Sequence, residues 1–450
     1  MKHFPSKRNA QEMLEALGMK SLDELFADIP EEVRVDGLNL PEGMSEMALS
    51  RAMEHTLAQN VDSLSFLGGG VYRHFVPAAV RAILSRSEFY TAYTPYQPEI
   101  SQGVLQAFFE YQCFIAELTG MPVSNVSLYD ASSAAAEALL MSARVNRKAK
   151  NVVVSGALPS HKKSVIQNYL KGAELEIRWL NIEKETGCVN LARLGELVDK
   201  ETAGVYVENP NYFGILDGNV LKVKDVLKEL NPKTLLILGV NPLTLFAVTP
   251  PGSYGADIVV GEGQVFGNAP SYGGPLLGLF ATVEKKKLLF QMPGRVIGIT
   301  KDSRGERGFT MTLQSREQHI KREKASSNIC SNQGLCTLAA VVHLAVMGKT
   351  GLMELAKQNM ENARYLASEI EKLEGFLLPF GASPVFNEFV VRSEKTDIKE
   401  LNRKGREAGI LPGIALVDHF PKMEKDFLVT TTEVHTKEEL DRFVAFLKSA

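Results

Sequence analysis

The segment from residue 255 to residue 275 has the arrangement of a cofactor-binding turn but lacks the residue that would carry the chemistry. A strand-like run ends at Val260, the chain passes through several glycines, and a second strand-like run starts near Leu276. Enzymes that use pyridoxal phosphate place a lysine at such a turn, because its amine forms an imine with the cofactor aldehyde. No lysine occurs between residues 234 and 284. This turn therefore cannot hold a cofactor through an imine.

A second segment, residues 130–137, could bind an anion. Asp130 precedes an alanine-rich run and can cap the helix that we expect there. Free N–H groups around Ser132 and Ser133 would then lie at a helix N-terminus, where phosphate groups bind. An ordinary cap on a buried helix explains the same residues, and the sequence leaves both interpretations open.

A third segment is a loop with two prolines, which stiffen its backbone. From this backbone Tyr93, Tyr96, Gln97 and Glu99 present hydroxyl, amide and carboxylate groups. Such a loop suits the wall of a small-ligand cavity or a contact between subunits. A packed turn whose tyrosines satisfy buried hydrogen bonds is equally compatible.

Other catalytic signatures are missing. The sequence contains no GxxxxGK[ST] loop, no HExxH and no GxSxG, and Gly261-Glu-Gly263 lacks the third glycine of a dinucleotide-binding turn. Lys162 and Lys163 follow the strand-like run 152–154, so one of them could be an imine-forming lysine. Paired lysines that open a helix usually form a solvated face, and we keep this interpretation as the alternative.

Alternating strand-like and helix-like runs must position these segments. The helix-like runs include 160–170 and 223–230. The strand-like runs are 152–154, 175–180, 205–207, 235–238, 258–260 and 276–281. This alternation predicts an α/β fold with a mainly parallel sheet covered on both faces. Ligands of such sheets bind at the carboxyl ends of the strands.

The composition along the chain predicts three domains. We expect an N-terminal helical arm at 1–60, a large domain at 61–325 and a small C-terminal α/β domain at 326–450. In the arm, a helix over residues 10–17 would place Met13, Leu14 and Leu17 on one face. The small domain would begin with helical runs at 335–346 and 352–373, continue with strand-like runs at 376–393 and 410–431, and end with a helix at 437–447.

Charge and composition exclude several classes of protein. The 450 residues contain 50 Lys and Arg against 53 Asp and Glu, so the net charge of -3 gives no general attraction to nucleic acid or to an anionic membrane. We find no signal-like start and no uninterrupted apolar run of membrane-spanning length. The four cysteines form no CxxC pair, and we expect neither a disulfide scaffold nor a metal site. A reducing compartment, by default the cytoplasm, is the expected location.

Three segments resemble the glycine decarboxylase P-protein of the glycine cleavage system. They are Ala92-Tyr-Thr-Pro-Tyr-Gln-Pro-Glu-Ile-Ser-Gln-Gly103, Tyr272-Gly-Gly-Pro275 and Glu323-Lys-Ala-Ser-Ser-Asn-Ile-Cys330. The resemblance covers nearly the whole chain and is to the subunit 1 (alpha) branch of the split family, which corresponds to the N-terminal half of the fused P-protein. It implies the fold of fold-type-I pyridoxal-phosphate transferases, with a large, mainly parallel domain and a smaller C-terminal α/β domain.

The same resemblance implies that both chemical groups of the cofactor site are replaced. Gln264 stands at the position of the imine-forming lysine, and Asn241 stands near the position of the aspartate that faces the pyridine nitrogen. Neither amide can do the work of the group it replaces. The resemblance therefore implies an alpha subunit without catalytic residues of its own, joined to a beta subunit (subunit 2) that binds pyridoxal phosphate, in an alpha2-beta2 heterotetramer. That assembly would decarboxylate glycine and transfer the aminomethyl group to the lipoyl arm of H-protein.

The resemblance also suggests where the contributions of this chain lie. Near the contact with the beta subunit, Tyr93, Tyr96 and Gln97 would line the active-site cavity or the lipoyl channel, and Glu99 and Ser101 would hold their loop in place. His74 is a weaker candidate for the same wall. A degenerate cofactor pocket would retain Ser132, Ser133, Gln264 and Tyr272. A pure scaffold that recruits H-protein is the remaining alternative.

Overall fold

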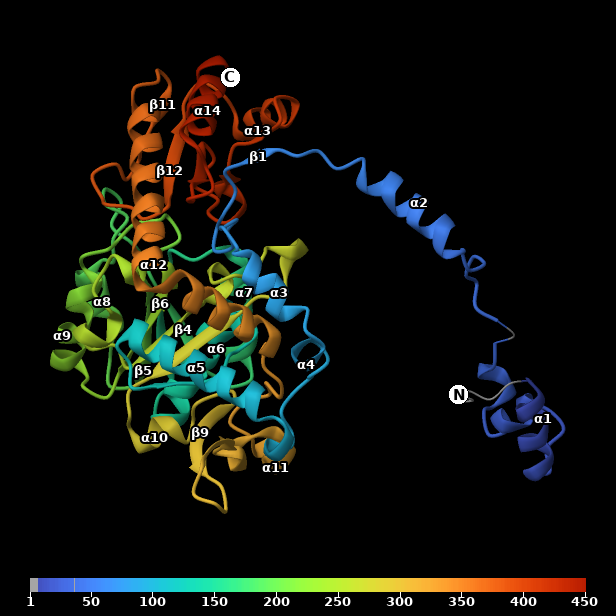
Figure 1. Ribbon diagram of the computed structural model, residues 1–450. Helices are drawn as coiled ribbons and strands as arrows, with labels where there is room; N and C mark the ends of the chain where they lie inside the picture. Colours follow the sequence, from blue (N-terminus) through green and yellow to red (C-terminus); the bar gives the residue numbers. More distant parts are fainter. Residues whose placement is uncertain (1–6, 36) are drawn as a thin grey trace. The chain divides into compact units, whose positions relative to one another are not determined.

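The strands predicted in the middle of the chain form one seven-stranded sheet in the computed structural model, which describes residues 7–35 and 37–450 (Figure 1). The strand order is β2-β8-β7-β6-β5-β3-β4. The strands from β7 to β4 run parallel, whereas β8 is antiparallel to β7 and to β2. The predicted mainly parallel sheet is confirmed. Its strands are β2 (Val123–Ser124), β3 (Asn151–Ser155), β4 (Glu176–Leu180), β5 (Thr202–Glu208), β6 (Leu235–Val240), β7 (Ile258–Glu262) and β8 (Gly278–Thr282).

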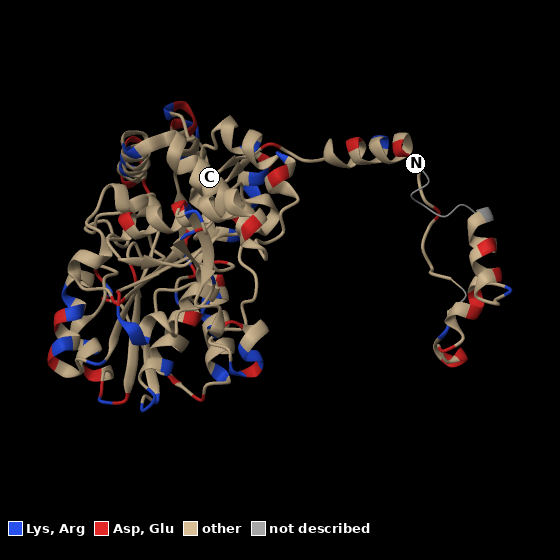
Figure 2. Ribbon diagram, turned by 60° about the horizontal axis from the view of Figure 1, so that its bottom comes forward, with Lys and Arg blue, Asp and Glu red and all other residues tan. Residues whose placement is uncertain are grey.

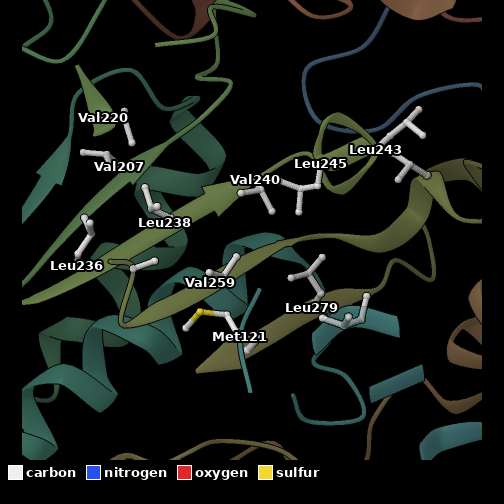
Figure 3. Close-up of a cluster of buried hydrophobic side chains, with 14 of the residues drawn as sticks. Met121, Val207, Val220, Leu236, Leu238, Val240, Leu243, Leu245, Val259 and Leu279 are labelled. Carbon is white, nitrogen blue, oxygen red and sulfur yellow. The ribbon is translucent and has the colours of Figure 1, made fainter. Parts of the chain in front are cut away.

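Helices cover both faces of this sheet because successive side chains of its central strands point into two apolar cores. In β3, Val153 belongs to one buried cluster, and Val152 and Val154 belong to the other. The first cluster, part of which is shown in Figure 3, packs under α5, α8, α9 and the start of α12, and the second packs under α6 and α7. The bounds are α5 (Gln102–Thr119), α6 (Ala131–Val145), α7 (Ser160–Lys171), α8 (Leu191–Leu197), α9 (Val220–Leu230) and α12 (Gly334–Glu371).

A second, four-stranded antiparallel sheet lies in the C-terminal part of the chain, in the order β11-β12-β15-β14. Its core includes Phe389, Phe427 and Phe443 together with Leu366 of α12. The bounds are β11 (Phe376–Leu377), β12 (Glu388–Ser393), α13 (Ile398–Glu407), β13 (Ile410–Leu411), β14 (Ile414–Ala415), β15 (Asp426–Thr430) and α14 (Lys437–Ser449). Strand β1 (Leu64–Ser65) pairs with β13, so a segment from early in the chain joins this C-terminal region.

Short elements connect the larger ones. The charged region around residues 304–324 contains the end of a hairpin, in which β9 and β10 pair antiparallel. The bounds are α3 (Ala78–Leu84), α4 (Ser87–Tyr90), α10 (Lys286–Leu289), β9 (Val296–Lys301), β10 (Arg307–Thr312) and α11 (Gln318–Lys321).

The described chain divides into two compact units, one ending at Val61 and one beginning at Asp62. The first contains α1 (Lys7–Ala16) and α2 (Glu46–Leu57), joined by extended and 3-10 segments. A helix is found where residues 10–17 predicted one, but of its expected apolar face Leu14 is buried, whereas Met13 is 54% and Leu17 62% exposed. The division of the remaining chain at residues 325 and 326 stays a prediction.

Charge and hydropathy add two observations. Lys and Arg residues are interspersed with Asp and Glu over the helices, as Figure 2 shows. Among the described residues, α12 is long and apolar enough to cross a membrane by length and composition, a property that we did not expect from the sequence. Half of its most apolar window is buried inside the protein, and a single helix of this kind is weak evidence for a membrane span.

Candidate active site and its cavity

A small cavity of about 70 Å³ lies at the carboxyl ends of β5, β6 and β7. This is the edge at which parallel sheets bind ligands. The side chains and glycines from the strand ends that line it are Tyr206, Glu208, Gly239, Asn241, Gly261 and Glu262. One buried water needs about 10–15 Å³ of such space, so the cavity can hold water molecules.

Glu262 ends β7 and connects three segments at the floor of the cavity. Its Oε2 accepts the N–H of Ala131 at 3.0 Å, and its Oε1 accepts those of Gln264 at 3.1 Å and Leu277 at 2.8 Å. Burial raises the pKa of Glu262 to about 7, although the three N–H donors act in the opposite direction. The carboxylate thus lies at the start of α6, where the sequence suggested an anion site.

The predicted cap of α6 is present, and the cap itself uses N–H groups of the expected anion site. Asp130 Oδ1 accepts the N–H of Ser133 at 2.7 Å, and the Ser133 hydroxyl accepts the N–H of Asp130 at 3.2 Å. Ser133 is buried and Ser132 half-buried, but the structure assigns the cavity wall to Ala131 instead. The start of α6 is therefore a capped, buried helix, and the N–H of Ala131 binds Glu262, whereas anion binding by the N–H groups around Ser132 and Ser133 stays a prediction.

Gln264 follows Glu262 and is 1% exposed. Its Oε1 accepts the N–H of Tyr72 at 2.9 Å, and its Nε2 donates to the carbonyl oxygens of Tyr72 at 2.9 Å and Asn268 at 2.5 Å. The amide therefore pairs with both backbone groups of a residue 192 positions away. The ammonium group of a lysine has no acceptor atom, so it could not accept the Tyr72 N–H as the Gln264 amide does.

Asn241 and Lys162 both line the cavity, but each is hydrogen-bonded to a neighbouring group of the chain. The Oδ1 of Asn241 accepts the N–H of Leu243 at 3.1 Å and so caps a short 3-10 helix, while its buried Nδ2 has no partner among the described residues. Lys162 Nζ pairs with Glu208 Oε1 at 2.6 Å, and the Tyr206 hydroxyl donates to the same oxygen. Lys163 does not line the cavity; its Nζ lies 4.7 Å from the ring centre of Phe420.

A buried carboxylate from the small sheet also reaches the cavity, and sequence reasoning missed it. Glu388 begins β12 and accepts the N–H of Gly69 at 2.7 Å and the hydroxyls of Tyr72 at 2.7 Å and Thr430 at 2.9 Å. Burial raises the pKa of Glu388 and also that of Tyr72. A glutamate in an apolar strand was the available signal, but nothing in the sequence identifies its three donors.

The tyrosine–proline loop presents its tyrosines to solvent. Tyr93 is 76% and Tyr96 65% exposed, and Gln97 and Glu99 are exposed as well. The Tyr93 hydroxyl lies 3.3 Å from the Ser331 hydroxyl. The structure therefore disfavours the packed-turn interpretation, because these tyrosines do not satisfy buried hydrogen bonds.

Residues other than the predicted ones hold this loop in place. The side chain of Ser101 makes no capping bond, and no side-chain bond of Glu99 is seen in the described part of the chain. Instead, Gln102 Nε2 donates to the carbonyls of Pro98 at 2.7 Å and Phe309 at 2.9 Å, and its Oε1 accepts the Phe309 N–H at 2.8 Å. Arg295 donates to Thr94 and lies under the Tyr96 ring at 5.9 Å. Nothing in the sequence indicates this role for Arg295, which is distant along the chain.

The structure separates the two remaining candidates from the cavity. Tyr272 is fully exposed and is not among the cavity-lining residues of the described chain. The side chain of His74 is buried, and its Nδ1 pairs with Glu433 Oε2 at 2.8 Å. Asn359 Nδ2 donates to the same oxygen at 2.8 Å, so His74 belongs to a buried polar cluster that joins distant segments.

Comparison with known proteins gives consistent results. A family profile described as glycine cleavage system P-protein matches residues 1–447. Two curated relatives, each named probable glycine dehydrogenase (decarboxylating) subunit 1, are 46% identical: that of Carboxydothermus hydrogenoformans over 99% of both chains, and that of Oceanobacillus iheyensis over 98% of this chain and 96% of its own. An inhibitor-bound glycine decarboxylase (P-protein) of the glycine cleavage system superposes with a TM-score of 0.90 at 37% identity, over 100% of both chains. Lactobacillus brevis glutamate decarboxylase, at 13% identity over 93% of this chain and 95% of its own and a TM-score of 0.69, shares the fold alone.

Proposed function

The chain belongs to the glycine cleavage system P-protein family, and from this membership we propose that it is the alpha subunit of a glycine dehydrogenase (decarboxylating) whose cofactor is held by a homologous beta subunit. Pyridoxal phosphate, when bound by that subunit, takes up the electrons released as glycine loses its carboxylate. The assembly is an alpha2-beta2 heterotetramer in the cytoplasm, and lipoylated H-protein accepts the aminomethyl group.

The observation that carries the proposal is the poor fit between this chain's own cavity and pyridoxal phosphate. Gln264 offers an amide that cannot form an imine and is already bound to Tyr72. Glu262 occupies the helix N-terminus that a cofactor phosphate would need. No step of the reaction is therefore assigned to a cofactor in this chain.

What this chain contributes is a rigid wall beside the partner's active site. Tyr93, Tyr96 and Gln97 project from a loop that Gln102 and Arg295 tie to the β9–β10 hairpin and to the segment that leads into it. Exposed aromatic side chains on such a loop are suited to a subunit contact. There they would exclude water from the reacting carbon and line the path of the lipoyl arm.

The direct test measures exchange between the carboxylate of glycine and labelled bicarbonate. We expect no exchange by this chain with added pyridoxal phosphate, and full activity when it is mixed with the homologous partner and lipoylated H-protein. Tyr96→Phe should lower exchange in the assembled enzyme, whereas Tyr365→Phe, on α12, should not. Exchange by this chain alone would overturn the proposal.

The catalytic alternative, with Lys162 or Lys163 as the imine-forming residue, has a separate test. An ammonium paired with Glu208 has no lone pair to attack an aldehyde, which argues against Lys162. Incubation of the chain with pyridoxal phosphate and reduction with borohydride should leave neither lysine modified. A pyridoxyl group on one of them in the peptide map would support the alternative.

The scaffold alternative makes a different prediction for the tyrosine loop. If this chain only recruits H-protein, Tyr96→Phe should weaken H-protein binding and leave glycine–bicarbonate exchange untouched. Under our proposal the exchange reaction itself falls, because the loop lines the reacting cavity.

A further inference from the structure

We propose that the carboxylate of Glu262 is an internal substitute for a phosphate group, which occupies the anion-binding start of α6 and keeps phosphate esters out of the cavity. The inference rests on the proposed function, in which this chain binds no cofactor. It explains how the anion-binding start of α6 is occupied in a chain of this fold without a bound cofactor.

The geometry around Glu262 is that of an anion site with its ligand in place. One carboxylate oxygen accepts from Ala131, the first residue of a helix that is 15 residues long. The other accepts from Gln264 and from Leu277, which precedes β8. Three backbone N–H groups from three segments thus converge on one carboxylate, and a helix N-terminus adds partial positive charge to the first of them.

The surrounding packing shows that this contact holds the sheet and helix together. A Cβ atom on Gly278 of β8 would lie 2.5 Å from the Asp130 carbonyl, so the strand and the helix cap approach as closely as backbone allows. Glu262 is 8% exposed and reaches from β7 to the contact between β8 and the start of α6. A bound phosphate would bridge the same strand, helix and turn, and the carboxylate does so without an external ligand.

Shortening Glu262 should therefore recreate a phosphate site. Glu262→Ala removes the carboxylate and one methylene, leaves the donors of Ala131 and Leu277 in place, and joins the vacated space to the adjoining cavity of about 70 Å³. Glu388→Ala is the matched control, because it removes the same atoms from the wall of the same cavity but lies at no helix start.

The test follows the thermal unfolding midpoint of the full chain as inorganic phosphate replaces chloride at constant ionic strength. It is done at pH 8, above the pKa of about 7 that burial gives Glu262. We expect a saturable rise in the midpoint for Glu262→Ala and none for the wild type or Glu388→Ala, because a ligand of the native state stabilises it by mass action. If Glu262→Ala is unfolded in chloride, phosphate should restore its circular dichroism spectrum.

Three results would overturn the inference: a folded Glu262→Ala that ignores phosphate, an unfolded one that phosphate does not rescue, or an equal response of Glu388→Ala. A wild-type chain that itself forms a borohydride-stable pyridoxyl-lysine would instead contradict the proposed function. The two failures are therefore distinguishable.

Discussion

Single residues decide which chemistry this chain retains. Gln264 is at once the residue that excludes an imine and the partner of both backbone groups of Tyr72. The absence of lysine around the turn could be predicted from the sequence. The bond to Tyr72 could not, because nothing local specifies a partner 192 residues away.

The structural role of Gln264 predicts a large loss of stability when its amide is removed. Gln264→Met keeps the length of the side chain but leaves the buried N–H and C=O of Tyr72 unpaired. Because each unsatisfied buried group costs about 1–3 kcal/mol, we expect these two to lower the free energy of unfolding by about 2–6 kcal/mol. Guanidinium unfolding measures this. The exposed Gln106→Met is the control, and equal effects of the two variants would contradict the role.

The buried pair of Glu433 and His74 predicts a pH dependence of stability. Burial acts to raise the pKa of Glu433, but His74, the Phe75 N–H and the Asn359 amide lower it to about 2 from its ordinary 4.5. A carboxyl whose pKa is lower in the folded state stabilises the fold above pH 4.5 and loses this effect as the pH falls toward 2. The difference corresponds to about 3 kcal/mol.

Glu433→Gln should therefore be less stable than the wild type at pH 7, and the gap should narrow between pH 4.5 and pH 2. Urea unfolding at a series of pH values measures both free energies. Glu361→Gln, on the surface of α12, is the control. A constant difference in unfolding free energy between wild type and Glu433→Gln over this range would mean that the charge of Glu433 does not contribute to stability.

Helix α12 shows how closely an element can follow its sequence pattern. The sequence predicts two helical runs, at 335–346 and 352–373, and α12 consists of two helical stretches joined at a kink. The kink lies at Gly348, whose φ of 60° and ψ of 177° are a conformation that side chains oppose. The pattern thus located the break between the two helical stretches.

Replacing Gly348 should destabilise the protein through the strain of its backbone conformation, and not through steric crowding. A Cβ at this position meets no atom within 4 Å among the described residues, so crowding adds nothing. Holding alanine in this conformation costs about 1–3 kcal/mol, and Gly348→Ala should lower the free energy of unfolding by that amount. Gly351→Ala, three residues on with helical geometry, should be neutral or stabilising by up to about 1 kcal/mol. Denaturant unfolding compares the two variants. A stabilising effect of Gly348→Ala would show that the rest of the structure does not require the kink at residue 348.

At the scale of the whole molecule, the sequence predicts the architecture but not the side-chain contacts between separate elements. Alternating apolar runs predicted the parallel sheet, since short buried strands and helices have distinct periods. They could not predict that β12 brings Glu388 against Gly69 and Tyr72. Nor could they predict that Arg295 supports the loop of Tyr96. Such contacts depend on the packing of separate elements, which leaves no local trace in the sequence.

The proposed heteromeric assembly predicts that exposed tyrosines become protected. Tyr93 and Tyr96 are 76% and 65% exposed in this chain, and a subunit contact of ordinary size removes about 800 Å² from each partner. Tetranitromethane should therefore nitrate both residues in the isolated chain and much less in the complex with the beta subunit. Peptide mapping would quantify this. Tyr365 should react alike in both states, and the fully buried Tyr111 should react in neither. Undiminished nitration of Tyr93 and Tyr96 in an active complex would place the contact with the partner elsewhere.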